Sequence, residues 1–312
     1  MADASPTAIT VLIPTLALRA RGGVIRRALD SIRTQSGVAA RALIVVNGAE
    51  KDPDLLAELR RDPVVDLVEI TDRGIPAALR AGRALVATRY FTALDDDDEF
   101  LPGALAARVA ALEADPGLDA VVTNGIVRSA SGDSLHRPGL ATVRRDPLRA
   151  MIQGNWLLPG SWTCRSDRVG KWLFEGMPEH RECTWIGLQL AIRAQVAYLD
   201  APTVVWYSDT PAAAHRSLAY AMGQVPAMGQ LLSLPLPRDV QGYFRAAVRQ
   251  AMHEVAHRLL VVEGDRRAAW RWHLQSLRGE GGLRHLLFSR KFLYPRAWLT
   301  EAPELPEGGG PA

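Results

Sequence analysis

Cysteine is scarce in this chain of 312 residues. Its two cysteines, Cys164 and Cys183, do not form a CxxC pair, so neither a disulfide framework nor a zinc knuckle is expected. No apolar run approaches the roughly 20 residues that a membrane-spanning helix needs. The first residues also lack the basic and apolar regions of a secretory signal. These absences favour a protein of the reducing cytoplasm.

Biased composition is confined to the end of the chain, which reads EGGGPA. We expect residues 301–312 to form a disordered tail. The remainder, with 48% hydrophobic and 23% charged residues over the whole sequence, is typical of a globular protein. Its length is compatible with one large domain or two ordinary ones.

Positive charge is concentrated towards the C-terminus, although the net charge is only +3. Residues 241–300 contain eleven Arg or Lys and four Asp or Glu, together with Trp270, Trp272 and Trp298. This basic, aromatic end could make peripheral contact with an anionic membrane surface or with phosphorylated substrates. Solvated faces of Arg-rich helices explain the same residues. We expect no nucleic acid partner.

Strand and helix patterns alternate over the first 125 residues. The expected strands are residues 8–13, 42–46, 64–70, 90–94 and 120–123, and the expected helices are residues 24–33, 55–61, 76–87 and 103–113. Such alternation predicts βαβ units and a mostly parallel sheet flanked by helices. Pro14, Asn47 and Asp95 follow expected strands, at the carboxyl edge where such sheets bind ligands.

The pattern is less regular after residue 124. Residues 129–133 (SASGD) predict a hairpin turn, residues 154–170 predict loops, and residues 185–193 predict a helix. Residues 196–199 and 203–207 predict two further strands. Residues 242–279 are again helical in pattern, which indicates a C-terminal helical extension.

The most unusual stretch, residues 91–103, reads FTALDDDDEFLPG. A turn normally uses one or two Asp, whereas this strand end carries four Asp and one Glu. The stretch could be a solvated acidic turn. Carboxylates that converge at a strand end also suit a hard divalent cation such as Mg²⁺ or Mn²⁺, which in turn binds the phosphates of a nucleotide.

Three segments together give this stretch a family context. ITVLIPT, ALIVVNGA and DRGIPAALRAGRALVATRYFTALDDDDEFLPG resemble the nucleotide-binding half of the family 2 glycosyltransferases. The residues in register with that family's motifs are Gly74, Ala78, Gly82, Leu94, Asp95, Asp97, Asp98, Leu101 and Pro102. The likeness covers residues 8 to about 217 and implies a GT-A-type α/β fold, Rossmann-like, with a DXD motif.

The resemblance also implies roles for residues near the donor. Pro14 and Thr15 would lie beside the nucleotide base, and Asn47 stands where the family usually has the aspartate that holds uracil. Arg80 is one place later than the family's arginine. Within the acidic motif, Asp95 and Asp96 would face the nucleotide and Asp97 would ligate the metal. Asp98 and Glu99 would face solvent.

A second, looser likeness implies the acceptor side. GSWTCRSDRVGKW resembles the family's acceptor-facing loop, and residues 182–202 resemble its Glu-Asp helix and following strand. Inverting members use the aspartate of that pair as general base, and Cys183 occupies its position here. Glu182 is therefore the candidate base, with Glu179 and Asp209 as alternatives, although a helix-start acid needs no catalytic role. His215 would approach the metal.

The resemblance thus implies an inverting, metal-dependent transfer of a sugar from a nucleotide-diphosphate donor, UDP-sugar above all, to an acceptor hydroxyl. The acceptor could be a saccharide, a lipid-linked molecule or a small molecule. We expect a nucleotide-sugar half over residues 1–125, an acceptor half over residues 126–235 and a helical extension over residues 236–300.

Two other functions remain open at this point. Residues 251–260 (AMHEVAHRLL) contain His253-Glu254-x-x-His257, the zinc-binding pattern of metalloproteases. No third ligand is evident, and a polar helix face explains the same letters. Because Cys183 replaces the family's base, the chain could also be a relative that binds a nucleotide-sugar without catalysis.

Overall fold

The computed structural model describes residues 8–208, 217–294 and Leu299. The expected tail, residues 301–312, lies outside them. The chain divides into two compact units. The first, here called the sheet unit, comprises Met1–Pro147, Trp156–Met177 and Glu182–Pro211. The second, the helical unit, comprises Leu148–Asn155, Pro178–Arg181 and Ala212–Ala312.

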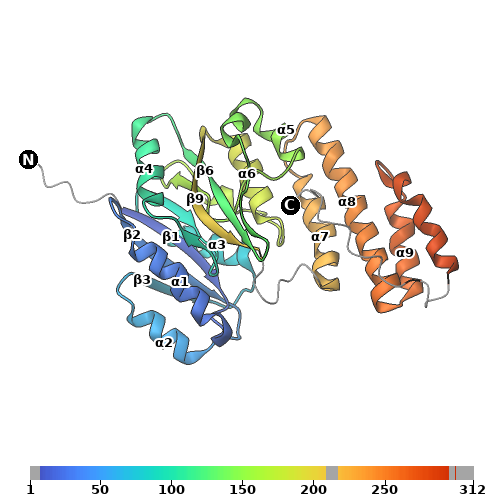
Figure 1. Ribbon diagram of the computed structural model, residues 1–312, viewed down its shortest axis with the longest axis horizontal. Coiled ribbons are helices and arrows are strands. Elements are labelled where there is room, and N and C mark those ends of the chain that lie inside the picture. Colours follow the sequence, from blue (N-terminus) through green and yellow to red (C-terminus); the bar gives the residue numbers. More distant parts are fainter. Residues whose placement is uncertain (1–7, 209–216, 295–298, 300–312) are drawn as a thin grey trace, which may run out of the picture. The chain divides into compact units, whose positions relative to one another are not determined.

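Parallel strands form the first half of the sheet, as predicted. They are β1 (Ala8–Thr15), β2 (Ala39–Asn47), β3 (Val65–Ile70) and β4 (Tyr90–Ala93), in the order β3-β2-β1-β4. Figure 1 shows β1, β2 and β3 of this sheet. The connecting helices are α1 (Gly22–Arg33), α2 (Pro53–Arg61) and α3 (Ile75–Leu85). These crossovers bring the carboxyl ends of the strands to one edge.

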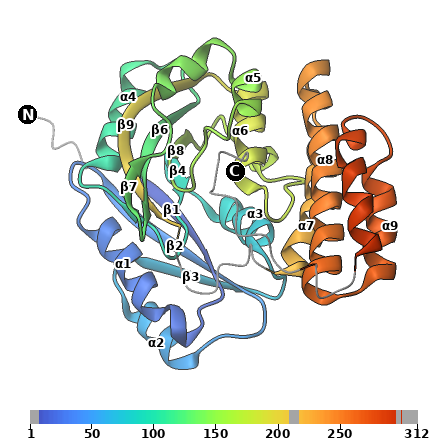
Figure 2. The ribbon, with the colours of Figure 1, turned by 45° about the vertical axis from the view of Figure 1, so that its right-hand side comes forward.

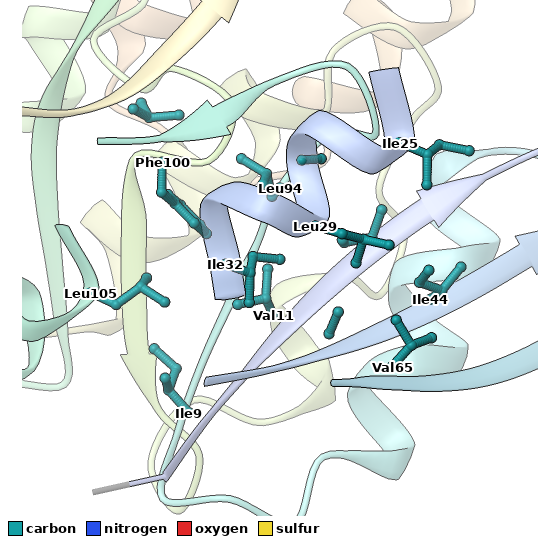
Figure 3. Packing of buried hydrophobic residues seen from close by; sticks show 14 of the residues in the cluster. Ile9, Val11, Ile25, Leu29, Ile32, Ile44, Val65, Leu94, Phe100 and Leu105 are labelled. Carbon is teal, nitrogen blue, oxygen red and sulfur yellow. The ribbon is translucent and has the colours of Figure 1, made fainter. Parts of the chain in front are cut away.

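The two faces of this sheet are covered by different helices. Val11 and Ile44 face a core with Ile25 and Leu29 of α1, and α4 (Ala104–Ala114) adds Leu105 to the same cluster (Figure 3). On the other face, α3 approaches so closely that a methyl group at its Gly82 would lie 3.0 Å from Leu12 and 3.1 Å from Val45. Successive strand residues point to opposite faces of the sheet, and helices cover both faces. The strands are therefore apolar on both sides and buried.

The second half of the sheet is mixed, and the sequence pattern missed part of it. The remaining strands are β5 (Glu99–Phe100), β6 (Ala120–Ser129), β7 (Gly132–Leu135), β8 (Trp162–Arg165) and β9 (Val196–Tyr207). The order continues β4-β8-β6-β9-β5, with β7 beside β6 across the predicted SASGD turn (Figure 2). Residues 154–170 were expected to be loops, yet β8 pairs antiparallel with both β4 and β6. A four-residue strand among Pro and Gly carries too little pattern to be recognised without its partners.

Residues 196–207 also form one strand rather than the two expected. Asp200 and Pro202 interrupt the apolar alternation, which is why the sequence suggested a break. In the structure, the pairing of β9 with β6 continues through register shifts at Thr123/Asn124 and Asn124/Gly125. A bulge of this kind absorbs the irregular residues without ending the strand.

The remaining α-helices are α5 (Pro147–Ile152), α6 (Glu182–Arg193), α7 (Leu218–Leu231), α8 (Arg238–Arg258) and α9 (Arg266–Ser276), with a π-helix at Leu259–Glu263 and a 3₁₀ helix at Gly282–Leu293. Of these α-helices, α6 belongs to the sheet unit, and α5 apart from its first residue, α7, α8 and α9 belong to the helical unit. Val255, Leu260, Ala269 and Phe288 belong to the helical unit's own core. Within the described residues, no helix combines the length and apolar character needed to cross a membrane.

Gly125, at the β6 bulge, has no room for a side chain. A Cβ there would lie 2.8 Å from the Val204 side chain and 3.0 Å from its carbonyl oxygen. We expect Gly125→Ala to lower the free energy of unfolding by about 1–3 kcal/mol, because β-branched Val204 and the strand backbone cannot yield easily. Urea denaturation measures the change.

Gly23→Ala is the matched control, since nothing lies within 4 Å of a Cβ at that position in α1. It should leave stability unchanged or raise it by up to about 1 kcal/mol. Equal losses in the two variants would contradict the steric explanation.

Candidate active site

Side chains at the ends of β1 and β2 are fixed by hydrogen bonds to backbone. Asn47, 4% exposed, donates from Nδ2 to the Thr15 carbonyl (2.9 Å) and accepts at Oδ1 from the Gly74 backbone N–H (2.9 Å). The amide therefore joins β1, β2 and the start of α3. Ala17 follows with φ of +50°, a strained value for a residue with a side chain. The tight turn after β1 redirects the chain into Arg19–Arg21.

Asp96 is held from two directions by this turn. Thr15 Oγ1 donates to Asp96 Oδ2 at 2.6 Å, and Arg21 Nε donates to the same oxygen at 2.8 Å. The Arg21 Nη2 group also pairs with Asp96 Oδ1 and lies 3.1 Å from Asp97 Oδ2. These carboxylates raise the pKa of Arg21, so its guanidinium group stays positively charged. Thr15 and Asp96, which the sequence assigned to the nucleotide, thus lie in contact.

Three other groups of the motif form a cluster of carboxylates. One oxygen each from Asp95, Asp97 and Asp98 lies within 4.8 Å of the others. Burial and the charges of Asp97 and Asp96 raise the pKa of Asp95, and burial and the charge of Asp95 raise that of Asp98. Three like charges at this separation are costly unless a cation or protons offset them.

The prediction that Asp98 faces solvent is wrong, because its side chain is fully buried. Oδ1 accepts a hydrogen bond of 3.1 Å from the Tyr207 backbone N–H of β9. Oδ2 is buried and has no hydrogen-bond partner among the described residues. The short strand β5 turns the chain back beside β9, and this long-range pairing carries Asp98 inward. Glu99 is partly exposed and accepts from the Tyr207 hydroxyl at 2.8 Å.

These carboxylates are suitable ligands for a hard divalent cation. All three offer oxygen ligands, and their negative charges repel one another. The buried Oδ2 of Asp98 accepts no hydrogen bond from the described residues, so a cation could bind to it. Asp98 thus joins Asp95 and Asp97 as a candidate ligand. The cluster could hold a metal ion, although its donor set does not distinguish Mg²⁺ from Mn²⁺.

A second arginine that sequence reasoning missed borders this cluster. Arg27 of α1 donates from Nη2 to the Asp97 carbonyl oxygen, and its guanidinium lies 3.7 Å from the centre of the Tyr207 ring. Its charge lowers the pKa of Asp98, against the larger effect of burial. Arg21 and Arg27 sit six residues apart in a stretch that reads as an ordinary basic helix start, so only the fold reveals their partners.

Glu182, the predicted base, is the first residue of α6 and lies near the acidic motif. The charge of Glu182 is close enough to raise the pKa of Asp95. Burial, followed by the charges of Asp95, Glu182 and Asp98, raises the pKa of Cys183 well above its usual range. Cys183 therefore stays a neutral thiol at physiological pH, whereas Glu182 is a partly exposed carboxyl group beside the acidic cluster.

Other predicted site residues are not joined to this cluster in the described structure. Pro14 is buried within β1, next to Thr15. Arg80 is exposed on α3 and lines a shallow hollow with Glu69 and Asp72. Glu179 belongs to the helical unit. His215 and Asp209 lie outside the described residues.

The zinc pattern does not form a metal site. The His253 ring on α8 stacks against His285, with 4.2 Å between the ring centres, and it packs edge-on against Phe288. Among the described residues, only Asp95, Asp97 and Asp98 form a group of three ligand side chains close enough to share a metal ion. His253 and His257 are thus packing residues of the helical unit, and the zinc protease alternative is not supported.

The fold and the strand-end motif define a glycosyltransferase of the GT-A type. Residues 10–165, half of the chain, match the family described as Glycosyl transferase family 2, and the chain belongs to that family. It is therefore an enzyme that transfers a sugar from a nucleotide-sugar donor. Curated protein sequences gave no match.

Solved structures of TarS from S. aureus are similar in fold. TarS 1–349 in complex with UDP-GlcNAc aligns with a TM-score of 0.57 and 11% identity, covering 91% of this chain and 92% of that one. TarS 1–349 without a named ligand gives a TM-score of 0.52 and 10% identity, covering 91% of each chain. At such low identity the similarity concerns the fold.

The buried carboxylates predict a pH-dependent effect of Asp98→Asn. The folded protein holds protons on Asp95 and Asp98 more tightly than the unfolded chain does, so this site costs stability progressively as pH rises above about 4. We expect Asp98→Asn to raise the metal-free free energy of unfolding by about 1–3 kcal/mol at pH 8 and by less at pH 5. The asparagine oxygen can still accept from Tyr207.

Urea denaturation at both pH values, compared with the exposed control Asp167→Asn, measures this effect. A gain that is equal at both pH values would show that repulsion among the carboxylates is not its cause.

Proposed function

We propose that this enzyme transfers a sugar from a UDP-sugar to an acceptor hydroxyl, with a divalent cation at the acidic motif and inversion at the sugar carbon. The observation that carries the proposal is the carboxylate cluster of Asp95, Asp97 and Asp98. On the nucleotide side Thr15 donates to the adjacent Asp96, and on the acceptor side the charge of Glu182 raises the pKa of Asp95. The UDP-GlcNAc complex of TarS supports UDP as the nucleotide.

On the donor side, the chain would bind nucleotide and diphosphate with different groups. Thr15, Asp96 and the backbone at Asn47 would meet the nucleoside. Asp95, Asp97 and Asp98 would hold Mn²⁺ or Mg²⁺, which when bound would neutralise the diphosphate and stabilise it as a leaving group. Arg21, fixed beside Asp96 and Asp97, adds a permanent positive charge at the same place. His215 remains a proposed further ligand, and Arg80 a proposed nucleotide contact.

On the acceptor side, Glu182 would accept the proton from the attacking hydroxyl. Its neighbour Cys183 is a poor base, because desolvation and the charges of nearby carboxylates raise the pKa of its thiol well above the usual range. A base on the face opposite the leaving group permits in-line attack and inversion. The acceptor could be a saccharide, a lipid-linked molecule or a small molecule, and a cytoplasmic location remains our expectation.

Donor specificity can be tested with a panel of UDP-, GDP- and dTDP-sugars in the presence of Mn²⁺. We expect UDP-sugars to raise the melting temperature and to be hydrolysed slowly. Asp97→Asn should abolish the part of the stabilisation that depends on Mn²⁺, because a metal ligand is lost. Asp167→Asn should behave as the wild type. The absence of stabilisation by any of these donors would refute the proposed function.

The assignment of the base is tested by Glu182→Gln. We expect kcat to fall roughly 10²–10⁴-fold with little change in donor affinity, which is the usual contribution of a general base. Cys183→Ala should retain most of the activity, because the thiol takes no part. If Cys183→Ala were the more damaging change, or if kcat survived in Glu182→Gln, the base would have to be sought elsewhere.

A further inference from the structure

The helical unit contains a cavity of about 450 Å³, a size typical of small-molecule sites. Its walls are mostly apolar and include Met228, Tyr220 and Tyr243 together with four alanines. Every residue that lines it belongs to the helical unit. The nucleotide-sugar site therefore does not account for this cavity.

The lining follows α8 for most of its length. Two neighbouring rows of α8, each with a spacing of four residues, contribute: Tyr243, Ala247 and Ala251 in one, and Ala246, Gln250, Glu254 and Arg258 in the other. From Tyr243 to Arg258 the helix advances by about 22 Å at 1.5 Å per residue. Alanine side chains leave the space open along this path. The cavity is thus an elongated groove, which fits a linear apolar chain better than a compact ring.

Three guanidinium groups and one carboxylate, Glu254, border the groove. Arg284 donates from Nη2 to the Ala246 carbonyl oxygen (3.4 Å) and to Gln250 Oε1 (3.2 Å), and from Nε to His285 Nε2 (3.2 Å). None of these acceptors is a carboxylate. No carboxylate of the described residues lies within ion-pair distance of Arg284. Arg181 and Arg258 add two further positive charges to the lining. Apolar walls with an excess of guanidinium groups are complementary to a ligand that has an apolar body and an anionic head.

We propose that this groove binds a lipid that carries one phosphate group, with its chain along α8 and its phosphate on Arg284. Arginine matches phosphate geometry through two parallel N–H bonds, and burial of the chain supplies the remaining affinity. The site is a separate binding function and does not depend on the sugar-transfer reaction proposed above.

Isothermal titration with farnesyl phosphate, below the concentration at which it forms micelles, tests this proposal. We expect saturable binding of one molecule per chain, and no comparable binding of farnesol or inorganic phosphate, since each lacks one half of the ligand. Arg284→Gln should weaken binding roughly tenfold through the lost charged hydrogen bonds. Ala247→Phe should abolish binding by filling the groove.

Arg245→Gln is the matched control on the same helix, since Arg245 lies outside the groove and pairs with Glu280 at 2.8 Å. Circular dichroism confirms that each variant is folded. Equal affinity for farnesol and farnesyl phosphate, or equal loss in Arg245→Gln and Arg284→Gln, would overturn the proposal. So would binding that occurs only to phosphatidylglycerol vesicles, which would indicate a membrane surface contact. Titration of UDP-sugars with the same preparations keeps failure of this site distinct from failure of the donor site.

Discussion

Repulsion among carboxylates at the end of β4 is the constraint around which the sheet unit is arranged. The charge of Asp96 is offset by an ion pair with Arg21 and a hydrogen bond from Thr15. Asp95, Asp97 and Asp98 lie close together, and they do not each have such an ion pair. Such a cluster is tolerated only because the surrounding sheet holds it in place. In the function that we propose, a cation bound here would relieve this repulsion, and the relief would contribute to the free energy of cation binding.

The same constraint explains the position of the neighbouring groups. Arg27 reaches across to the backbone of Asp97 and stacks on Tyr207, and the backbone of Tyr207 in turn holds Asp98. At the start of α6, the charge of Glu182 raises the pKa of Asp95, and the charges of Asp95, Glu182 and Asp98 help to raise the pKa of Cys183. Burial and the neighbouring negative charges keep the Cys183 thiol protonated, whereas the adjacent carboxyl group of Glu182 is the base that we propose.

Local patterns were sufficient for elements whose neighbours are near in sequence. The alternation of strands and helices up to β6 follows from apolar periodicity, and the acidic motif was recognisable as a strand end because Tyr90–Ala93 is a short apolar run followed at once by charge. Helices α8 and α9 were predictable for the same reason, whereas α7 and the 3₁₀ helix at Gly282–Leu293 were not predicted. Strand β8 and the unbroken β9 were not, because their identity depends on pairing with β4 and β6, which lie far away in the chain.

The sequence by itself determined the family, the parallel half of the sheet and the place of the acidic motif, because each depends on short-range patterns and on residue types in order. Only the tertiary structure decided that Asp98 is buried in the cluster, that Arg21 and Arg27 are its cationic neighbours and that Glu182 lies beside it. The structure also shows that His253 of the zinc pattern stacks against His285, and that a groove lies along α8. Each of these results depends on side chains brought together from distant segments, and burial and charge acquire their values only after that assembly.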